Sequence, residues 1–382
     1  MARTIIVGID IRDLSIAKTG SKTYLEELCK QFKEINNQEF KFYFIDTFFP
    51  VYTGTNLFLK LVEQFRFIIW KQISLPLIAF CYRCDIVFCT DYFVPYLHLG
   101  YTTIPVFHDA FFWEYPEHYN KYWLMLFKKL GVAAAKRSAF VVTTTKYAKE
   151  RIVSFSRMDE KKIIPVYEAP KLFADKKNQE NLSPLFFSEK IAQPYILHVG
   201  TFEKRKNLSL LIKAFHTLID NGYPDFKLIL VGQSSVKTDM DDSDAIKKLI
   251  NQYQLEEKIS LTGYVPDETL HIYYQHAFVY VFPSLNEGFG LPVLEAFQHN
   301  VPVLVANNTC LPEVGGNAVV TFDPYDADEL FQKIKQIIEE PILKQQLIEK
   351  GKKRLQLFSW NKTASQLLTI FETAVKEKTN DQ

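Results

Sequence analysis

The stretch FPSLNEGFGLPVLEAF, residues 282–297, joins the end of an apolar strand to a helix through a glycine-containing turn. Gly288 and Gly290 allow backbone conformations that other residues avoid, and the proline that follows suits the first turn of a helix. Glu287 lies in the turn, and Glu295 lies about one helical turn beyond the proline. Free N–H groups in such a turn bind anions, whereas carboxylates beside them are suited to bind hydroxyl groups. We therefore expect a ligand site at this turn, with both carboxylates pointing toward the same opening.

Two series of alternating strand and helix patterns surround this turn. The first runs from TIIVGIDI (4–11) to KYAKERIVSF (146–155), and the second runs from PYILHVG (194–200) to VPVLVAN (301–307). Short apolar runs separated by amphipathic helices are typical of parallel sheets that are buried on both faces. We therefore predict two doubly wound, Rossmann-like α/β domains, with ligands at the carboxyl ends of their strands.

A polar segment separates the two series. Residues 170–194, PKLFADKKNQENLSPLFFSEKIAQP, are bounded by prolines and show no periodicity, which is typical of a linker. A chain of 382 residues is also too long for one ordinary core. We therefore predict one domain in residues 1–180, a second in residues 190–360 and a final helix in residues 361–382. Two such domains that face each other form a cleft, and clefts hold most ligand sites.

The composition predicts a soluble, cytoplasmic protein. The formal net charge of +1 offers no electrostatic attraction to a nucleic acid, so we expect no nucleic-acid partner. The amino terminus lacks the apolar length of a signal peptide, and five cysteines in such a chain indicate reduced thiols. The longest apolar stretch is interrupted by Lys71 and Pro76, which argues against a membrane span. Cys81, Cys84 and Cys89 lack a second pair of ligands, so we expect core residues and no zinc.

A second loop carries two cations. The segment GTFEKRKN, residues 200–207, follows an apolar strand and contains Arg205 and Lys206. A guanidinium binds phosphate oxygens in pairs and an ammonium acts as a point charge, so together they can neutralise a diphosphate. Asn207 is placed to cap the helix that follows. Because this loop and the acidic turn end strands of the same predicted sheet, they indicate a site for a sugar linked to a nucleotide diphosphate.

Two other interpretations of these loops remain open. GFGLPV matches the first part of a dinucleotide fingerprint, but Val293 replaces its third small residue. Asn307 also stands where an acidic residue would bind ribose, which disfavours a nicotinamide dehydrogenase. Alternatively, Glu287 caps a loop, Glu295 is a solvated helix residue and the basic loop is merely exposed.

The combination of GTFEKRKN with PSLNEGFGLPVLEA and LPEVGG resembles the family 4 glycosyltransferases, which are retaining enzymes with the GT-B fold. The resemblance covers most of the chain and is strongest over residues 194–323. It implies that Glu287 contacts the transferred sugar and that Glu295 binds the ribose hydroxyls. It implies that Arg205 and Lys206 hold the diphosphate. It further implies a donor-binding set that comprises Gly288, Phe289, Gly290 and Leu291 beside phosphate and sugar, and Gly263, Tyr264 and Val265 at the base.

The amino-terminal half resembles the family less closely. His108 follows a strand at the position of the family's histidine near the transferred sugar, which implies a catalytic residue. The first loop is usually glycine-rich, whereas here Gly20 and Ser21 are the candidates for contact with donor or acceptor. Asn300 replaces the glycine that usually ends the helix of the acidic turn, and asparagine tolerates the same left-handed backbone. Residues 358–378 resemble the closing helix that crosses back onto the amino-terminal, acceptor-binding domain.

Two Asp-x-Asp pairs could suggest a metal site. They are Asp239 with Asp241 and Asp242 with Asp244, and glycosyltransferases of the other major fold hold a divalent ion with such a pair. Here the pairs directly precede a helix, where acidic residues favour the helix dipole and aspartate can cap. We therefore expect capping and no metal.

Membrane contact is a further hypothesis. Residues 118–138, HYNKYWLMLFKKLGVAAAKRS, combine basic and aromatic residues and could touch a bilayer. The interpretation that we favour is a helix that buries its apolar side on the sheet.

These observations together predict a metal-independent, retaining hexosyltransferase that uses a GDP- or UDP-sugar and no further cofactor. The expected acceptor is a glycan or a lipid-linked saccharide in cell-surface polysaccharide synthesis of the O-antigen or capsule type, at the inner face of the plasma membrane. A related sugar-nucleotide synthase and a non-catalytic subunit that binds nucleotide sugar are the alternatives. The sequence leaves the sugar, the base, the acceptor and the oligomeric state open.

Overall fold

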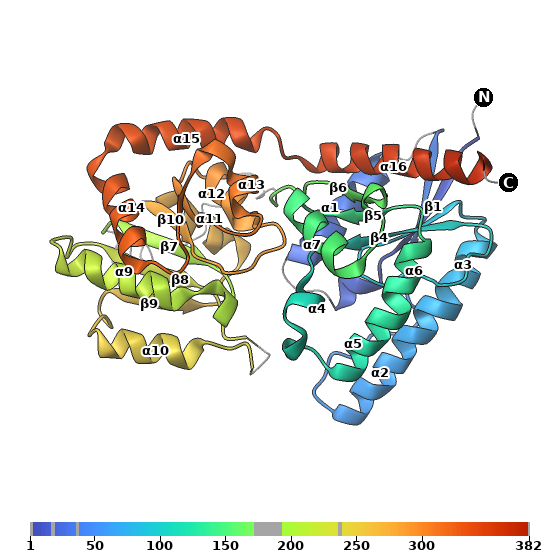
Figure 1. The fold of residues 1–382 in the computed structure, drawn as a ribbon, viewed down its shortest axis with the longest axis horizontal. Helices are drawn as coiled ribbons and strands as arrows, with labels where there is room; N and C mark the ends of the chain where they lie inside the picture. The colour runs from blue at the N-terminus through green and yellow to red at the C-terminus, as the bar shows by residue number, and fades with distance from the viewer. Residues whose placement is uncertain (1–2, 17–19, 36–37, 172–192, 236–238, 381–382) are drawn as a thin grey trace. The chain divides into compact units, whose positions relative to one another are not determined.

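The computed structural model describes all residues except 1–2, 17–19, 36–37, 172–192, 236–238 and 381–382. The chain divides into two compact units, which we call unit 1 (Met1–Ala169 with Ser359–Gln382) and unit 2 (Pro170–Phe358). Each unit is a parallel-sheet α/β domain, which confirms the predicted fold class (Figure 1). Most of the predicted linker lies outside the described residues.

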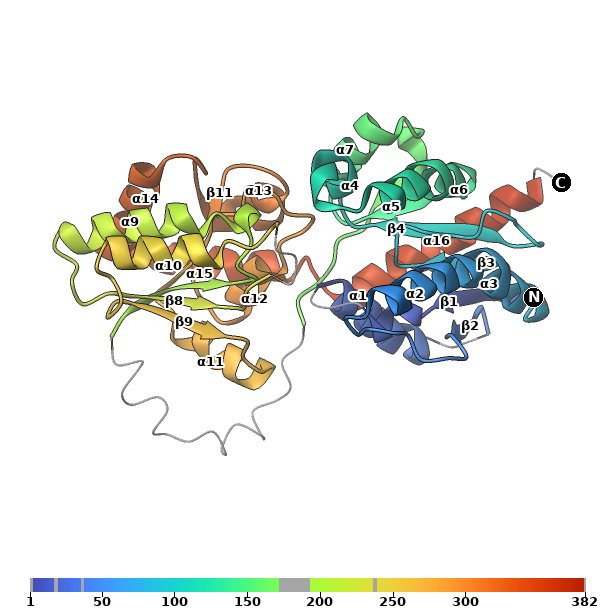
Figure 2. The same ribbon diagram turned by 90° about the horizontal axis from the view of Figure 1, so that it is seen from below.

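Unit 1 is built on a six-stranded parallel sheet in the order β2-β1-β3-β4-β5-β6. The strands are β1 (Ile5–Asp10), β2 (Phe40–Ile45), β3 (Ile86–Cys89), β4 (Thr102–Phe107), β5 (Val141–Thr143) and β6 (Ile163–Pro165). Every residue of β3 and β4 is buried, because helices cover both faces of the sheet (Figure 2). The strand order reverses between β1 and β3, and α/β sheets bind ligands outside the carboxyl ends of the strands at such a reversal.

The last helix of the chain belongs to unit 1. The helices of this unit are α1 (Gly20–Glu34), α2 (Leu57–Ile69), α3 (Leu75–Cys81), α4 (Phe111–Glu114), α5 (Lys121–Leu126), α6 (Val132–Arg137), α7 (Lys146–Ser156) and α16 (Trp360–Asn380). The ring of Phe371 on α16 packs against those of Phe32 and Phe88. Thr363 Oγ1 donates a hydrogen bond of 2.7 Å to the carbonyl of Tyr167. The carboxyl-terminal helix therefore completes the core of the amino-terminal domain.

Two long helices of unit 1 each contain a π-helical turn. The first turn, η2 (Trp70–Ser74), joins α2 to α3, and the second, η4 (Phe127–Gly131), joins α5 to α6. The apolar pattern of the sequence predicts a helix over about residues 57–73, whereas the helix that begins at Leu57 continues to Cys81. Pro76 lies in the first turn of α3, where its missing N–H is tolerated because the wider turn before it has already changed the hydrogen-bond pattern.

Unit 2 repeats this architecture with the strand order β12-β11-β10-β7-β8-β9, all parallel. The strands are β7 (Tyr195–Val199), β8 (Lys227–Val231), β9 (Ile259–Gly263), β10 (Val279–Phe282), β11 (Val303–Ala306) and β12 (Val319–Phe322). The helices are α9 (Leu208–Asp220), α10 (Ser243–Gln252), α11 (Asp267–His276), α12 (Leu291–Gln298), α13 (Leu311–Gly315), α14 (Ala327–Glu339) and α15 (Pro341–Leu355). Here the strand order reverses between the neighbouring strands β7 and β10.

A buried lysine lies at the strand reversal of unit 1. Lys71 Nζ contacts Asp10 Oδ2 at 2.6 Å and also pairs with Asp91, while the Trp70 indole N–H donates to Asp10. Asp10 and Asp91 form, with Cys89, the group of potential metal ligands found among the described residues. The ammonium of Lys71 already pairs with both carboxylates, and they in turn raise its pKa against the effect of burial. Lys71 thus takes the place that a cation would occupy.

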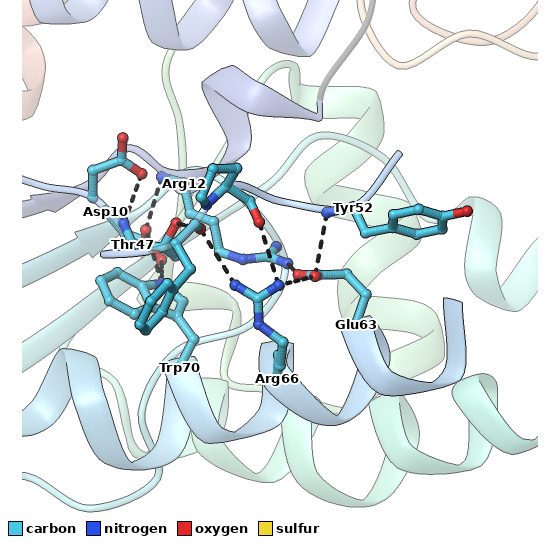
Figure 3. A network of polar contacts seen from close by, with 10 residues as sticks. Asp10, Arg12, Thr47, Tyr52, Glu63, Arg66 and Trp70 are labelled. Carbon is cyan, nitrogen blue, oxygen red and sulfur yellow. Dashed lines mark hydrogen bonds and ion pairs between the residues drawn. The ribbon is translucent and has the colours of Figure 1, made fainter. Parts of the chain in front are cut away.

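A second set of charges extends this network along α2. Glu63 accepts hydrogen bonds of 2.7 Å from both Arg12 and Arg66 and one of 3.3 Å from the Tyr52 backbone N–H (Figure 3). Arg12 and Glu63 are both buried. Because buried charges are stable only when they are paired, this network holds the inner face of α2 against the sheet edge.

Replacing Lys71 with methionine is expected to lower the free energy of unfolding by about 3–5 kcal/mol, because the buried carboxylate of Asp10 and the partly buried one of Asp91 lose their counter-ion. Urea denaturation of the parent and of the Lys71→Met variant measures this loss. The double variant Lys71→Met with Asp91→Asn should lose less stability, because only one buried carboxylate then remains unpaired. Equal unfolding midpoints for the parent and for Lys71→Met would contradict a structural role for this ion pair.

Candidate active site

The two loops singled out in the sequence meet at the strand reversal of unit 2. Arg205 and Lys206 lie in the 3₁₀ turn η7 (Lys204–Lys206) after β7, and the acidic turn follows β10. The backbone N–H of Leu285 donates to the Arg205 carbonyl at 2.7 Å, and Arg205 Nη1 donates to the carbonyl of Asn286 at 3.1 Å. The two loops therefore lie at one edge of the sheet, as predicted.

The cations and the first glutamate form one ion-paired cluster. Glu287 Oε1 lies 2.6 Å from Lys206 Nζ and 3.1 Å from Arg205 Nη1. Arg205 Nε also pairs with Glu203 Oε2 at 2.7 Å, a contact that was not predicted although Glu203 lies in the same motif. Two cations are thus matched by two carboxylates. The net charge of the site is therefore close to zero, whereas the sequence suggested two cations without carboxylate partners.

The protonation state of Glu287 follows from this cluster. Burial alone would raise the pKa of Glu287, but Lys206 and Arg205 outweigh burial and lower the pKa to about 2. Burial and the neighbouring Arg205 lower the pKa of Lys206, while Glu287 opposes them. The Arg205 side chain is 23% exposed and that of Lys206 is 9% exposed, so Arg205 is the more accessible to a ligand. Glu287 is therefore a fixed carboxylate that accepts hydrogen bonds.

The glycine turn presents backbone rather than side chains. Gly290 has φ +95°, and a Cβ at this position would lie 2.7 Å from Leu311, so no other residue fits without a shift. The Phe289 side chain is buried against Phe358, whereas Gly288 precedes it in the turn and Leu291 begins α12. Cys310 Sγ bonds to the carbonyl oxygens of Glu287 and Phe289, at 3.2 Å each. These contacts hold the turn in place from the inside.

Glu295 lies on α12, and its hydrogen-bond partner is a residue outside the ion-paired cluster. Its Oε2 accepts a hydrogen bond of 2.9 Å from the Tyr274 hydroxyl. Burial raises the pKa of Glu295 to about 7, Asp267 adds to the rise, and Tyr274 and Lys171 oppose it. Tyr280 on β10 lies within electrostatic reach of both Glu287 and Glu295. The two glutamates of the motif therefore differ in character: one is firmly ionised and the other titrates near neutrality.

The segment predicted to contact a nucleotide base follows β9, two strands away from β7. Gly263 has φ +73° and the Tyr264 side chain is 74% exposed, while Val265 is partly buried. An exposed aromatic ring at the carboxyl edge of a sheet is suited to stacking. The predicted left-handed residue at the end of α12 is also present, because Asn300 has φ +59°.

His108 lies in unit 1, directly after β4. Its Nε2 is 2.9 Å from the Thr90 carbonyl, and its Nδ1 is 3.3 Å from Glu168 Oε1. Burial lowers the pKa of His108, but the hydrogen bond and charge of Glu168 outweigh burial, so the net shift is upward. A ring with an acceptor at each nitrogen favours the imidazolium form. Gly20 and Ser21 form the first residues of α1 in the same unit.

Two helix caps predicted from the sequence lack the expected capping hydrogen bond. Asn207 stands at the amino-terminal cap of α9, but its φ is +55° and its side chain donates to the carbonyl oxygens of Pro283 and Pro324 instead. Asp242 occupies the cap position of α10 without a capping hydrogen bond from its side chain. Asp241 accepts hydrogen bonds from the Ser235 backbone and the Ser243 hydroxyl, which satisfies it within the loop. Asp239 and Asp244 are exposed.

Comparisons with known proteins identify the class of this fold. The chain superimposes on sucrose-phosphate synthase from Thermosynechococcus elongatus with a TM-score of 0.70 at 20% identity, over 97% of this chain and 99% of that chain. At this identity the likeness shows the fold alone. It is the GT-B fold of glycosyltransferases, as expected from the two parallel-sheet domains.

Sequence matches narrow the class further. Residues 185–354 match the family model described as glycosyl transferases group 1. The chain is 28% identical to O-antigen chain mannosyltransferase B of Escherichia coli, over 70% of each chain. It is 27% identical to O-antigen chain mannosyltransferase RfbU of Salmonella typhimurium, over 67% of this chain and 65% of that protein. These matches support a group 1 glycosyltransferase of the GT-B fold.

The pKa of His108 offers a direct check of its hydrogen bonds. Because Glu168 opposes the effect of burial, we expect the pKa of His108 to lie above 6.5 in the parent and to fall below it in the Glu168→Gln variant. NMR titration of the ring protons measures both values. A histidine with the same pKa in parent and variant would show that Glu168 does not control its charge.

Glu295 makes stability depend on pH in a defined direction. Its folded-state pKa of about 7 is above the ordinary value of 4.5 for a glutamate, so the protonated form stabilises the fold. This contribution is complete below pH 4.5 and is lost as the pH rises through 7. Glutamine cannot ionise, and the Glu295→Gln variant should therefore gain stability relative to the parent between pH 5 and pH 8. Unfolding midpoints across this range test the claim, and parallel curves for both proteins would refute it.

Proposed function

We propose that the protein is a retaining, metal-independent glycosyltransferase of family 4. It moves a hexose from a GDP- or UDP-sugar to a glycan or lipid-linked acceptor in the synthesis of a cell-surface polysaccharide. Relatives named as O-antigen chain mannosyltransferases favour mannose as the hexose. No helix among the described residues is long and apolar enough to cross a membrane. We place the membrane contact of the enzyme at the inner face of the plasma membrane.

The cluster of Arg205, Lys206 and Glu287 carries this proposal. It lies at the strand reversal of unit 2, where α/β folds bind nucleotides, and it combines phosphate-binding cations with a hydroxyl-binding carboxylate. Arg205 and Lys206 stabilise the charge that grows on the leaving diphosphate, and Glu287 orients the hydroxyl groups of the sugar. Gly288 and Gly290 allow the phosphate to approach the backbone of the turn.

The low pKa of Glu287 bears on the mechanism. A carboxylate with a pKa of about 2 is a weak base and is held by two cations, which disfavours it as the group that removes the acceptor proton. We therefore assign the proton to the departing phosphate oxygen, with the acceptor attacking from the same face as the leaving group. The configuration of the sugar is then retained, and the protein acts chiefly through electrostatic stabilisation.

The remaining residues position the two substrates. Glu295 binds the ribose hydroxyls in its ionised form, and the exposed ring of Tyr264, between Gly263 and Val265, stacks on the base. On the acceptor side, His108 supplies a positive charge near the sugar, and Gly20 with Ser21 borders the acceptor. This division gives nucleotide recognition to unit 2 and acceptor recognition to unit 1.

Replacing Arg205 should lower both donor affinity and turnover. Loss of one charged hydrogen bond of about 1.5–3 kcal/mol corresponds to roughly ten- to a hundredfold in kcat/KM for Arg205→Ala. Glu287→Gln should lower kcat but leave nucleoside diphosphate affinity equal or higher, because it removes a negative charge beside the cations. Lys204→Ala, an exposed lysine of the same turn, is the matched control and should behave like the parent.

The assay begins with a thermal-shift screen of UDP-, GDP- and dTDP-sugars, because a ligand that binds only the native state raises the melting temperature. Donor hydrolysis and sugar transfer are then followed with the selected donor, in the presence and absence of EDTA. An unchanged kcat/KM in Arg205→Ala would overturn the assigned role. Loss of transfer with EDTA would overturn metal independence, and binding without hydrolysis or transfer would favour a non-catalytic subunit.

A further inference from the structure

An unusually apolar surface lies on the outer side of α2 and α3. Every fourth residue from Leu57 to Leu77 is an exposed apolar residue, and we call this row the apolar ridge: Leu57, Leu61, Phe65, Ile69, Ile73 and Leu77. Phe58 and Phe80 extend it and are 70% and 60% exposed. Figure 1 shows α2 and α3 as one long helix along the edge of unit 1. A contiguous exposed apolar surface of this kind marks an interaction site.

The π-helical turn reduces the drift of the ridge around the helix. Four residues exceed one α-helical turn of 3.6 residues, so a row with this spacing drifts around a regular α-helix. The wider turn Trp70–Ser74 has i→i+5 hydrogen bonds and shifts the row in the opposite sense. The two ends of the ridge, Leu57 and Leu77, therefore lie closer to a common face than they would on a regular α-helix.

The inner face of the same helix is firmly held. Glu63, Trp70 and Lys71 are buried and belong to the polar network at the strand reversal, part of which appears in Figure 3. The ridge is therefore not a loosely packed helix that has failed to bury its apolar side. One face holds the charged network, and the other is exposed although it is apolar.

The charges around the ridge indicate the chemistry of that partner. Lys60 lies exposed on α2, and Lys121, Lys128 and Lys129 lie exposed on α5 and η4. The two segments are linked through Phe93, whose ring contacts Phe67 of α2 and Trp123 of α5. From residue 57 to residue 83 the one acidic residue is the buried Glu63, and residues 119–138 contain none. The partner must therefore be apolar and negatively charged.

This surface differs from the basic helix in residues 118–138, for which the sequence suggested membrane contact. On that helix Leu124 and Phe127 are buried in the core of unit 1, and Trp123 packs against them, as the favoured interpretation predicted. Tyr122 and Met125 remain exposed beside the lysines. The basic helix thus supplies charge, and the main apolar surface lies on α2 and α3.

We propose that the apolar ridge docks on an anionic lipid bilayer, with its aromatic and aliphatic side chains at the acyl boundary and the lysines of α2, α5 and η4 at the head groups. A second copy of the chain is disfavoured, because a symmetric contact would bring lysine-bearing surfaces together. The proposal deepens the proposed function, since it names the surface that would bring the enzyme to a lipid-linked acceptor.

Vesicle flotation tests this docking. The full chain should float with vesicles of phosphatidylglycerol and phosphatidylethanolamine, and much less with phosphatidylcholine alone. The combined variant Leu61→Glu, Phe65→Glu and Ile73→Glu should lower the bound fraction about tenfold or more, because it places charges at the acyl boundary. The matched control is Tyr325→Glu, Ile342→Glu and Leu357→Glu, which replaces apolar residues of unit 2 that are at least as exposed and should float like the parent.

A charge variant separates the electrostatic contribution of the lysines from the apolar contribution of the ridge. Lys128→Glu with Lys129→Glu should remove the preference for anionic vesicles, and high salt should have the same effect on the parent. All variants should keep the parental melting temperature and the parental rate of donor hydrolysis in solution, since neither set of residues lies in the proposed site. If the parent itself hydrolyses no donor, that result counts against the proposed function and not against docking.

Three results would overturn the proposal. The parent could fail to float with anionic vesicles, or the control variant could lose binding as strongly as the ridge variant. Sedimentation could instead show a dimer of the parent that Phe65→Glu dissociates while no vesicle binding is seen, which would assign the ridge to a second copy.

Discussion

A buried parallel sheet forces its strands to end at a common edge, and the rest of this structure depends on that constraint. Because helices cover both faces, polar groups have access to solvent chiefly at the loops that leave the carboxyl ends. In unit 2 the strand order reverses between β7 and β10, which brings the loop of Arg205 and Lys206 against the turn of Glu287. The two motifs are about eighty residues apart in sequence, and the sheet makes them neighbours.

Both units place a cluster of ion-paired side chains at this reversal. In unit 1 one cation, Lys71, lies between Asp10 and Asp91. In unit 2 one carboxylate, Glu287, lies between Arg205 and Lys206, and Glu203 pairs with Arg205 from the other side. Such pairs stabilise little beyond an apolar core of equal volume, but they are costly to break. Their effect is to fix polar groups in position at a sheet edge, which is what an electrostatic site requires.

The elements that were predictable are those with strong local patterns. The acidic turn with Gly290 and the basic loop with Arg205 carry their own backbone and charge signals, and so does the left-handed Asn300. The continuation of the long helix past Pro76 was missed, because a π-helical turn leaves no mark in the apolar periodicity. Contacts such as Glu168 on His108 and Tyr274 on Glu295 join distant segments, so no local pattern could reveal them.

The sequence by itself determined that the chain folds into two parallel α/β units and which loops carry phosphate- and hydroxyl-binding groups, because periodicity, turn glycines and charged residues act locally. The tertiary structure alone decided how these groups behave. Two glutamates of one motif have pKa values of about 2 and about 7, since one is held by two cations and the other is buried beside a tyrosine. The tertiary structure also decided which apolar helix is exposed, because the burial of a helix depends on which other elements pack against it.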